Sequence, residues 1–383
     1  MEFSWSPAQV ELRDAVQRFA VGTLNDDLAE RCRAGSFRRD LWQACADFGI
    51  LGMPIADTYG GSGQDLPTTV LAMEALGYGC RDQGLLFSIH AHLWAVVMPV
   101  VAFAEPLVRE ALLPRLIDGT LIGAHAMSEP DSGSHSYALR TSAVRDGDDY
   151  ILNGTKTFVS NGPVADLFVV FATVNPTRGM WGVTAFLVDR ESAGLRVSAP
   201  FAKMGLTTSP MSEVILEDCR VPATRLLGRE GQGHAVFNHS MGWERSCILA
   251  SQLGAMEYQL DTSLQYAKQR EQFGKPIGDF QLVASRLVDM KIRLETSRLL
   301  LYRTAWKHAR GEDITMDAAM VKLYLSEAAV QSALDAIQLH GGYGYMTEFG
   351  VERDLRDAVG GTLYSGTSEI QRLIIARAMG LRP

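Results

Sequence analysis

The sequence lacks the marks of a nucleic-acid-binding or metal-binding protein. Its 36 lysine and arginine residues are outnumbered by 44 aspartate and glutamate residues, so the formal net charge is −8. Nucleic-acid binding requires clustered basic side chains, and no basic block occurs. No set of cysteines and histidines has the spacing of a zinc site. We therefore expect no nucleic-acid partner and no bound metal.

Cysteine is scarce and scattered, with five residues in 383 and no CxxC pair. An odd number of dispersed cysteines argues against a disulfide framework and fits a reducing compartment. The first residues, "MEFSWSPAQVELRDAVQRF", lack the basic, apolar and small-residue series of a secretion signal. No uncharged stretch is expected to approach the length that spans a bilayer. These absences predict a cytoplasmic protein without a membrane partner.

Hydrophobic periodicity divides the chain into three predicted domains. Residues 1–121 are expected to be helical, with Ser6-Pro7 starting the first helix and another N-cap near Thr68. Residues 122–230 hold short β-branched and aromatic runs between turn residues, which favours a β-sandwich or barrel. Residues 231–383 return to long amphipathic helices suited to a four-helix bundle. The predicted fold class is therefore multidomain α+β.

Motifs along essentially the whole chain resemble the acyl-CoA dehydrogenase family. Each is weak alone, but their order and separations are specific. The matching stretches are "MSEPDSGS", "DGDDYILNGTKTFVSNG", "AD", "KMGLTTSP", "DCRVPATRLLG", "YAKQREQFGKPIGDFQ", "QLHGGYGYMTE", "RDLRDA" and "SGTSEIQRLIIAR". The resemblance implies the three-domain order above, bound FAD, and a homotetramer, built as a dimer of dimers, whose subunits share the cofactor site.

The resemblance also assigns cofactor contacts. No GxGxxG follows a strand, so a Rossmann-type dinucleotide site is not expected. The first motif and "FVSNG" would contact the flavin, "REQFGKPI" would reach the FAD of a neighbouring subunit, and "QLHGG" with the last motif would hold its phosphate and adenosine end. Arginine suits the pyrophosphate because its planar fork pairs with phosphate oxygens. The predicted cofactor residues are Met127, Ser128, Ser134, Phe158, Ser160, Arg270, Gln272, Phe273, Gln338, Gly341, Gly342, Thr367 and Glu369.

The turn "YSGTSE" has Ser365 where other members of the resembling family carry a catalytic glutamate. Removing an α-proton from a thioester requires a carboxylate, and a serine hydroxyl cannot replace it. Branches resembling isovaleryl- and long-chain acyl-CoA dehydrogenases instead place the glutamate on the first helix of the C-terminal domain, opposite a small residue. Glu244 in "MGWERSCILA" takes that position, so we predict Glu244 as the base. The alternative is an exposed carboxylate in the first turn of a helix.

Ser365 would then leave room for Glu244, and its backbone N–H could donate to the thioester oxygen, where negative charge develops. Burial against substrate and flavin would raise the pKa of Glu244 toward neutrality. The residues predicted to contact substrate are Ser134, Trp243, Arg245, Tyr364 and Gly366. His90 and His92 could also line the pocket, although histidines in apolar segments are more often core groups.

The pairing of "MGWERSCILAS" with "SGTSEIQ" resembles the carrier-protein-linked branch of the family. This implies a prolyl-like aminoacyl or short acyl thioester held on phosphopantetheine, in secondary metabolism such as antibiotic biosynthesis. An electron-transfer flavoprotein or oxygen would accept the electrons. The open alternatives are a short- or branched-chain acyl-CoA dehydrogenase, a flavin monooxygenase on the same fold, and a catalytically silent scaffold. An acidic carrier protein would dock on a local basic patch.

Overall fold

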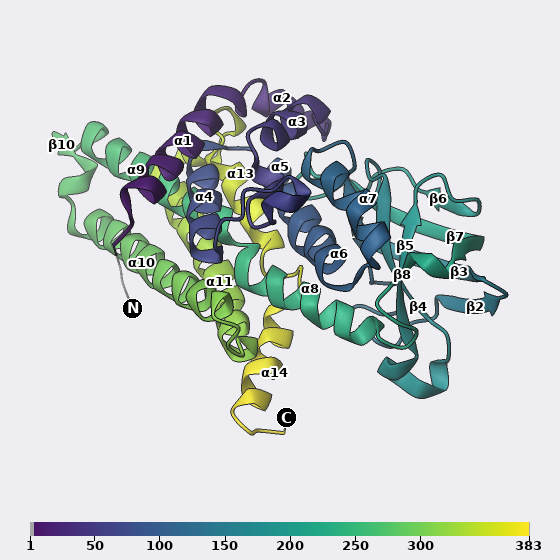
Figure 1. Ribbon diagram of the computed structural model, residues 1–383. Helices are drawn as coiled ribbons and strands as arrows, with labels where there is room; N and C mark the ends of the chain where they lie inside the picture. The colour runs from purple at the N-terminus through teal and green to yellow at the C-terminus, as the bar shows by residue number, and fades with distance from the viewer. Residues whose placement is uncertain (1–3, 383) are drawn as a thin grey trace.

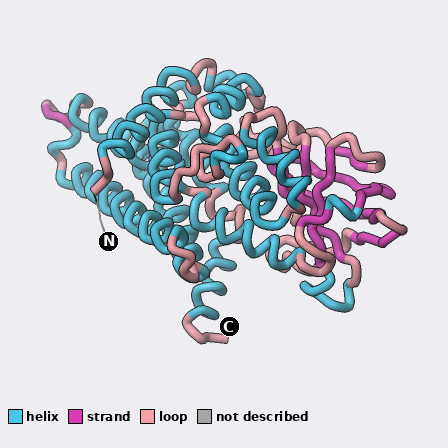
Figure 2. The backbone as a smooth tube through the Cα atoms, viewed as in Figure 1, coloured by secondary structure: helices cyan, strands magenta, loops and turns pink. Residues whose placement is uncertain are grey.

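The structure is a computed structural model that describes residues 4–382. Helices form the N-terminal region, a sheet lies at one end of the molecule, and a second set of helices completes the chain (Figure 1). The strands of the sheet gather on one side, and a small two-stranded hairpin lies at the opposite end (Figure 2). The predicted α+β order of helices, sheet and helices is confirmed.

The N-terminal region starts with helix α1 (Pro7–Thr23), which has the predicted cap. The Ser6 hydroxyl accepts from the Gln9 backbone N–H, and the Gln9 side chain accepts from the Ser6 N–H. Helix α4 (Leu66–Gly79) is capped by Asp65, whose carboxylate accepts from the Thr68 N–H. The cap expected near Thr68 is therefore Asp65. The remaining helices here are α2 (Leu28–Ala34), α3 (Arg39–Asp47), the short 3-10 helices η1 (Ile50–Gly52) and η2 (Asp57–Tyr59), α5 (Gln83–His92), η3 (Leu93–Val97), α6 (Met98–Phe103) and α7 (Pro106–Ile117).

The continuous segment Gln83–Phe103, formed by α5, η3 and α6, is 21 residues long and apolar enough by composition to cross a membrane. The expectation that no uncharged stretch approaches this length is therefore wrong. Because 83% of its most apolar window is buried inside the structure, the segment has the surroundings of a core helix. Its middle turn, η3, is a π-helix just before Pro99. Proline lacks the N–H that would continue the α-helical ladder, which accounts for a local change of winding.

An eight-stranded mixed sheet forms the middle region. Its strand order is β6-β7-β3-β2-β4-β5-β8, and β1 pairs in parallel with β4. Register shifts in β3 lie between Leu152 and Gly154 and between Lys156 and Val159, and such bulges re-aim side chains. The strands are β1 (Gly123–Ala126), β2 (Ser142–Asp146), β3 (Asp149–Ser160), β4 (Leu167–Thr173), β5 (Val183–Asp189), β6 (Leu195–Val197), β7 (Met211–Pro222) and β8 (Leu226–Leu227).

The C-terminal region is helical except for the hairpin β9 (Glu271–Gln272) and β10 (Lys275–Pro276). In the region of predicted long amphipathic helices, the run "HSMGWERSCILASQLGAMEYQLDTSLQYAKQR" forms two helices that meet near Ile248 and Leu249. Helix α11 packs against the other long helices of the region. The helices are α8 (Gly233–Cys247), α9 (Ala250–Gln269), α10 (Gln281–Ala309), α11 (Thr315–His340), α12 (Gly342–Tyr345), α13 (Val351–Gly360) and α14 (Ser368–Ala378).

The loop "KMGLTTSP" joins the three regions to one another. The Leu206 N–H donates to Asp357 of α13 at 2.5 Å, while the Thr207 hydroxyl donates to the Cys32 carbonyl at 2.8 Å. The Thr208 hydroxyl donates to Asp82, just before α5. Burial raises the pKa of Asp357 to about 7, opposed by its hydrogen bond with Leu206. These contacts fix the C-terminal helices relative to the N-terminal helices and the sheet.

Candidate active site

Glu244 and Ser365 meet across 121 residues of sequence. Glu244 lies in the last turn of α8 with only 8% of its surface exposed, and the Ser365 hydroxyl donates to its Oε2 atom at 2.7 Å. The reading of Glu244 as an exposed carboxylate in a first helical turn is therefore wrong. The nearer end of the helix dipole is the negative one, which does not favour an anion. The carboxylate is thus held at this place by tertiary contacts.

Burial raises the pKa of Glu244 to about 7. The hydrogen bond from Ser365 opposes this rise, as do the positive charges of Arg245 and Lys322. A carboxylate with a pKa near neutrality can both accept a proton and release it at physiological pH. The site therefore has the electrostatics that a general base requires.

The turn that carries Ser365 is held in an unusual backbone conformation. Ser365 has φ +55°, which is uncommon for a residue other than glycine, and Gly366 follows with φ +91°. The Arg245 Nε donates to the Ser365 carbonyl at 3.2 Å. The fully buried Gln371 donates to the Ser365 carbonyl at 3.1 Å and to the Gly366 carbonyl at 2.7 Å. These donors fix the turn so that the Ser365 hydroxyl points at the carboxylate.

The predicted pocket aromatics lie beside this turn. The Tyr364 ring is 4.6 Å from the ring of Phe87 on α5, measured between centroids. The Trp243 ring stacks on Trp94 of η3 at 5.7 Å with an interplanar angle of 2°, and its indole N–H donates to His239 at 3.1 Å. The buried segment Gln83–Phe103 therefore forms a wall next to the Glu244 turn.

His90 and His92 are core groups of that wall. The His90 Nδ1 accepts from the Trp94 indole at 2.8 Å, and its Nε2 lies 3.0 Å from the Ser251 hydroxyl. The His92 Nε2 lies 3.0 Å from the Leu116 carbonyl. Burial lowers the pKa of His90 to about 3 and that of His92 to about 4. Both rings are neutral at pH 7, as the core interpretation requires.

The motif "MSEPDSGS" is anchored by a buried ion pair. Lys156 of β3 is fully buried, and its Nζ lies 2.7 Å from Glu129 Oε1 and 3.2 Å from the Met127 carbonyl. Glu129 also accepts from the backbone N–H groups of Arg140 at 2.6 Å and Thr141 at 3.0 Å. The Met127 end of the predicted flavin-contacting motif is therefore rigidly positioned. Lys156 was not identified from the sequence, although it is a lysine within a strand of buried character.

The other predicted flavin residues lie around this motif. The Ser128 carbonyl accepts from the Thr157 N–H at 2.9 Å, so the motif runs alongside β3. Phe158 sits in the β3 bulge with φ +55° and 65% of its surface exposed, and Ser160 ends the strand. Ser134 lies in an exposed loop. An exposed aromatic ring re-aimed by a bulge beside a rigid loop fits the edge of a site that a planar ligand covers.

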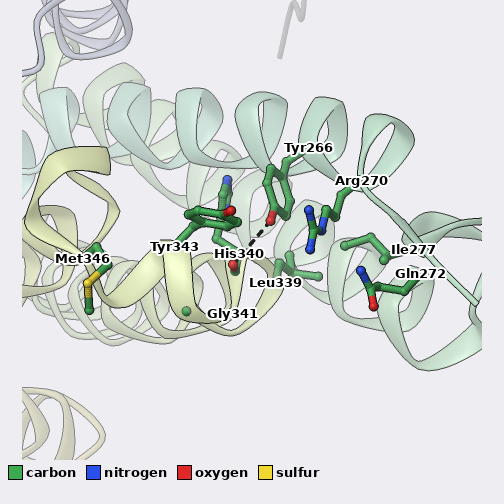
Figure 3. Close-up of a pocket in the computed structure, with 10 residues that line it drawn as sticks. Tyr266, Arg270, Gln272, Ile277, Leu339, His340, Gly341, Tyr343 and Met346 are labelled. Atoms are coloured by element: carbon green, nitrogen blue, oxygen red, sulfur yellow. Dashed lines mark hydrogen bonds between the residues drawn. The ribbon is translucent and has the colours of Figure 1, made fainter.

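A cavity of about 500 Å³ brings four predicted cofactor residues together at the far end of the molecule. Tyr266 and Arg270 reach it from the end of α9, and His340 reaches it from α11 (Figure 3). The rings of Tyr266 and His340 stack at 4.4 Å, and the Arg270 guanidinium lies 5.8 Å from the Tyr343 ring centroid. The lining residues are Tyr266, Arg270, Gln272, Ile277, Leu339, His340, Gly341, Gly342, Tyr343 and Met346.

Four residues predicted for this cofactor end do not line the cavity. Phe273 is 94% exposed at the tip of the hairpin, and Gln338 is exposed on α11. Thr367 caps α14 by accepting from the Ile370 N–H at 3.4 Å, and Glu369 is exposed in the first turn of that helix. Their roles toward a cofactor stay predictions.

Two groups of the predicted cofactor residues lie at opposite ends of the chain. The loop before β2 and the β3 bulge belong to the sheet end, whereas the cavity lies beside the hairpin at the other end (Figures 1 and 2). One chain therefore does not gather both groups around a single ligand. No group of three or more histidine, cysteine, aspartate or glutamate side chains within residues 4–382 is placed to hold a metal ion.

Comparison with known families matches three domains of one family. The acyl-CoA dehydrogenase N-terminal domain matches residues 6–120, the middle domain residues 124–219 and the C-terminal domain residues 231–380. The chain belongs to the acyl-CoA dehydrogenase family. The predicted family, fold class and enzyme class are thus confirmed.

Individual proteins of the family are similar to this chain in both sequence and structure. The chain is 47% identical over 341 residues to an L-prolyl-[peptidyl-carrier protein] dehydrogenase of Pseudomonas fluorescens, covering 89% of this chain and 90% of that protein. The crystal structure of the prolyl acyl carrier protein oxidase AnaB matches with a TM-score of 0.98 and 48% identity, covering 99% of this chain and all of that one. PigA with FAD and proline matches with a TM-score of 0.97 and 42% identity over the whole of both chains.

Proposed function

We propose that the protein oxidises the Cα–Cβ bond of a prolyl-like thioester held on a carrier protein, with Glu244 as the base. The observation that carries the proposal is the buried Glu244 carboxylate, held by the Ser365 hydroxyl in the turn where other family members carry the base. The names of its relatives support the substrate class: a prolyl-carrier-protein dehydrogenase, the oxidase AnaB, and PigA with proline.

The predicted cofactor, FAD, is confirmed by the family membership and by the FAD-bound relative. The residues of this chain fit it. Met127 and Ser128 offer a rigid backbone edge beside the exposed Phe158 ring, and the far cavity presents Arg270 with two glycines, where the absence of side chains admits a phosphate or adenosine. When bound, FAD supplies the acceptor for the hydride that leaves Cβ, through its N5 atom.

The protein's own groups handle the proton. Ionised Glu244 accepts the α-proton, and burial raises its pKa enough to make it an effective base. Ser365 orients the receiving carboxylate through its hydroxyl, while its backbone N–H is available for the thioester oxygen. Arg245 holds the Ser365 carbonyl and so keeps this N–H and hydroxyl in place. Tyr364 packs on Phe87 and Trp243 packs on Trp94, and these apolar contacts beside Glu244 limit the access of water to its carboxylate.

The active assembly is a homotetramer in which each cofactor site is completed by a second chain. The separation of two groups of predicted cofactor residues at opposite ends of the molecule supports the sharing of each site between two chains. The number of four chains comes from the family resemblance. An electron-transfer flavoprotein or oxygen reoxidises the flavin, and phosphopantetheine of a carrier protein presents the substrate. The alternative substrate is an acyl group carried on free CoA.

The proposal is tested by mixing the yellow holoenzyme anaerobically with one thioester at a time. The set comprises prolyl-carrier protein, short acyl-carrier proteins and the matching CoA esters, with flavin absorbance as the readout. We expect rapid bleaching with prolyl-carrier protein and rates at least a hundredfold lower with the CoA esters. Faster bleaching by a short or branched acyl-CoA would show that the substrate is carried on CoA and not on a carrier protein. No bleaching by any thioester would reject the reaction class.

A further inference from the structure

Lys322 on α11 is a buried ammonium group for which the proposed reaction assigns no role. Its relative exposure is 0%, and its Nζ has no hydrogen-bond partner among residues 4–382. A buried charge is normally paired, because its transfer out of water is costly. The fold therefore keeps a cation here at a cost in stability, which points to a use beyond packing.

The contacts of Lys322 connect it to the turn that carries Ser365, and through Ser365 to Glu244. Its Nζ lies 5.9 Å from the centroid of the Tyr364 ring, and Tyr364 directly precedes Ser365, which donates to Glu244. Helix α11 also packs against α8, which carries Glu244, and against α14, which follows the turn. One residue of the turn thus contacts the amine and the next contacts the carboxylate.

Charged groups reach Lys322 from each of these elements. Arg245 and Glu244 approach from α8, Glu327 lies on its own helix, and Glu369 lies on α14. The ring centroid of His308 on α10 lies 4.1 Å from that of Trp243. His308 is neutral at pH 7, because burial lowers its pKa to about 4. Glu244 is the buried carboxylate of this set, whereas Glu369 is exposed and Glu327 pairs with Arg372 at 2.8 Å.

We propose that Lys322 is a positioning residue for the base: its ammonium group, held over the Tyr364 ring, is a second through-space counter-ion that acts beside Arg245 to keep the Glu244 carboxylate ionised inside the protein. The inference rests on the proposed role of Glu244. Burial, and then the charge of Arg245, lower the pKa of Lys322 to about 8, so the amine is charged at pH 7. Between about pH 7 and about pH 8 the carboxylate and the amine are both ionised. This is the window in which the base is ready for the α-proton.

The test compares Lys322→Met with Lys322→Arg, which keeps the charge. Lys291→Met serves as the control, because Lys291 is 57% exposed on α10 and its ion pair is a surface one with Glu295. For each holoenzyme, flavin reduction by prolyl-carrier protein is followed anaerobically from pH 5 to pH 9. Without the cation the carboxylate protonates more readily, so we expect the acidic inflection of Lys322→Met to move up by about one pH unit. Lys322→Arg and Lys291→Met keep the wild-type inflection.

An unmoved inflection in Lys322→Met would overturn the inference. If that variant loses FAD, Lys322→Gln is measured in its place, and loss of FAD from both neutral variants would also overturn it by assigning the lysine to folding. Glu244→Gln, run in the same series, separates the two levels of the argument. Normal reduction by Glu244→Gln rejects the proposed base, whereas an inactive Glu244→Gln with an unmoved Lys322→Met rejects only the role of Lys322.

Discussion

Glu129 and Glu244 are both buried, but the pKa of Glu129 is lowered and that of Glu244 is raised. Burial raises the pKa of both, but at Glu129 the charge of Lys156 and hydrogen bonds from Lys156, Thr141 and Arg140 more than offset it, so its pKa is lowered. At Glu244 the Ser365 hydroxyl is the only hydrogen-bond donor found within residues 4–382, and the pKa rises to about 7. Burial alone therefore does not distinguish a structural carboxylate from a candidate base. Between these two glutamates the difference lies in the number and charge of the hydrogen-bond donors.

The comparison predicts the largest effect at the structural carboxylate. Lys156→Met leaves Glu129 buried without its cation, so we expect the free energy of unfolding to fall by roughly 3–5 kcal/mol and FAD to be lost. Denaturant unfolding and the flavin content of the purified protein measure both. Arg196→Met is the matched control, because the Arg196–Glu217 pair of the same sheet is about two-thirds exposed and should contribute less than about 1 kcal/mol. Equal losses in the two variants would contradict the comparison.

Glu244 should show the opposite response in stability. Because its folded pKa lies above its unfolded value, the folded state binds more protons between about pH 4.5 and pH 7, and stability falls as the pH rises through this window. Glu244→Gln removes this loss, so it should exceed the wild type in free energy of unfolding at pH 8 by up to about 3 kcal/mol. The gain should vanish at pH 4. A gain that is the same at both pH values would show that packing, not ionisation, causes it.

The next prediction concerns Arg270, which lines the cavity beside the hairpin, far from the two buried glutamates. Arg270→Ala should weaken FAD binding about tenfold or more, or loosen the assembly, because one charge-assisted phosphate contact is lost. FAD retention on gel filtration, together with the mass of the eluting species, measures this. Lys275→Ala in the same hairpin does not touch the cavity and should leave both unchanged. An intact flavin-bound tetramer of Arg270→Ala would contradict the shared-site interpretation.

The smallest effect concerns Ser365, whose hydroxyl is the hydrogen-bond donor to Glu244. Ser365→Ala removes the hydrogen bond that lowers the carboxylate pKa, so the acidic inflection of flavin reduction should rise by less than about one unit. The rate well above that inflection should stay within about tenfold of wild type. Thr362→Ala, which removes a hydroxyl bonded to the Val359 carbonyl, should leave the inflection in place. A downward movement in Ser365→Ala would mean that the hydroxyl does not favour the ionised form.

The order of domains was predictable from hydrophobic periodicity and motif order. The meeting of Glu244 with the Ser365 turn was predictable only through the resemblance to family branches that place the base on this helix. The site's supporting groups were not. Lys156 pairs with Glu129, 27 residues earlier, and the Lys322 Nζ has no hydrogen-bond partner within residues 4–382. Gln371 bonds the turn just before its own helix, but no local pattern indicates that its side chain is buried there. The long apolar stretch from Gln83 was also misjudged, since two histidines and a proline obscure its uninterrupted lack of charge. The substrate and the assembly stay proposals, because no local sequence pattern encodes the surfaces that a carrier protein or a second chain would contact.

The central claim is that the carboxylate of residue 244 takes the α-proton. Its most direct test is the rate of anaerobic flavin reduction by prolyl-carrier protein across pH 5–9, in the wild type and in Glu244→Gln with FAD bound. We predict a wild-type rate that rises through an inflection near pH 7 to a plateau, and a Glu244→Gln rate lower by about a thousandfold or more at every pH. A Glu244→Gln enzyme with a near-normal rate and the same inflection would contradict the account.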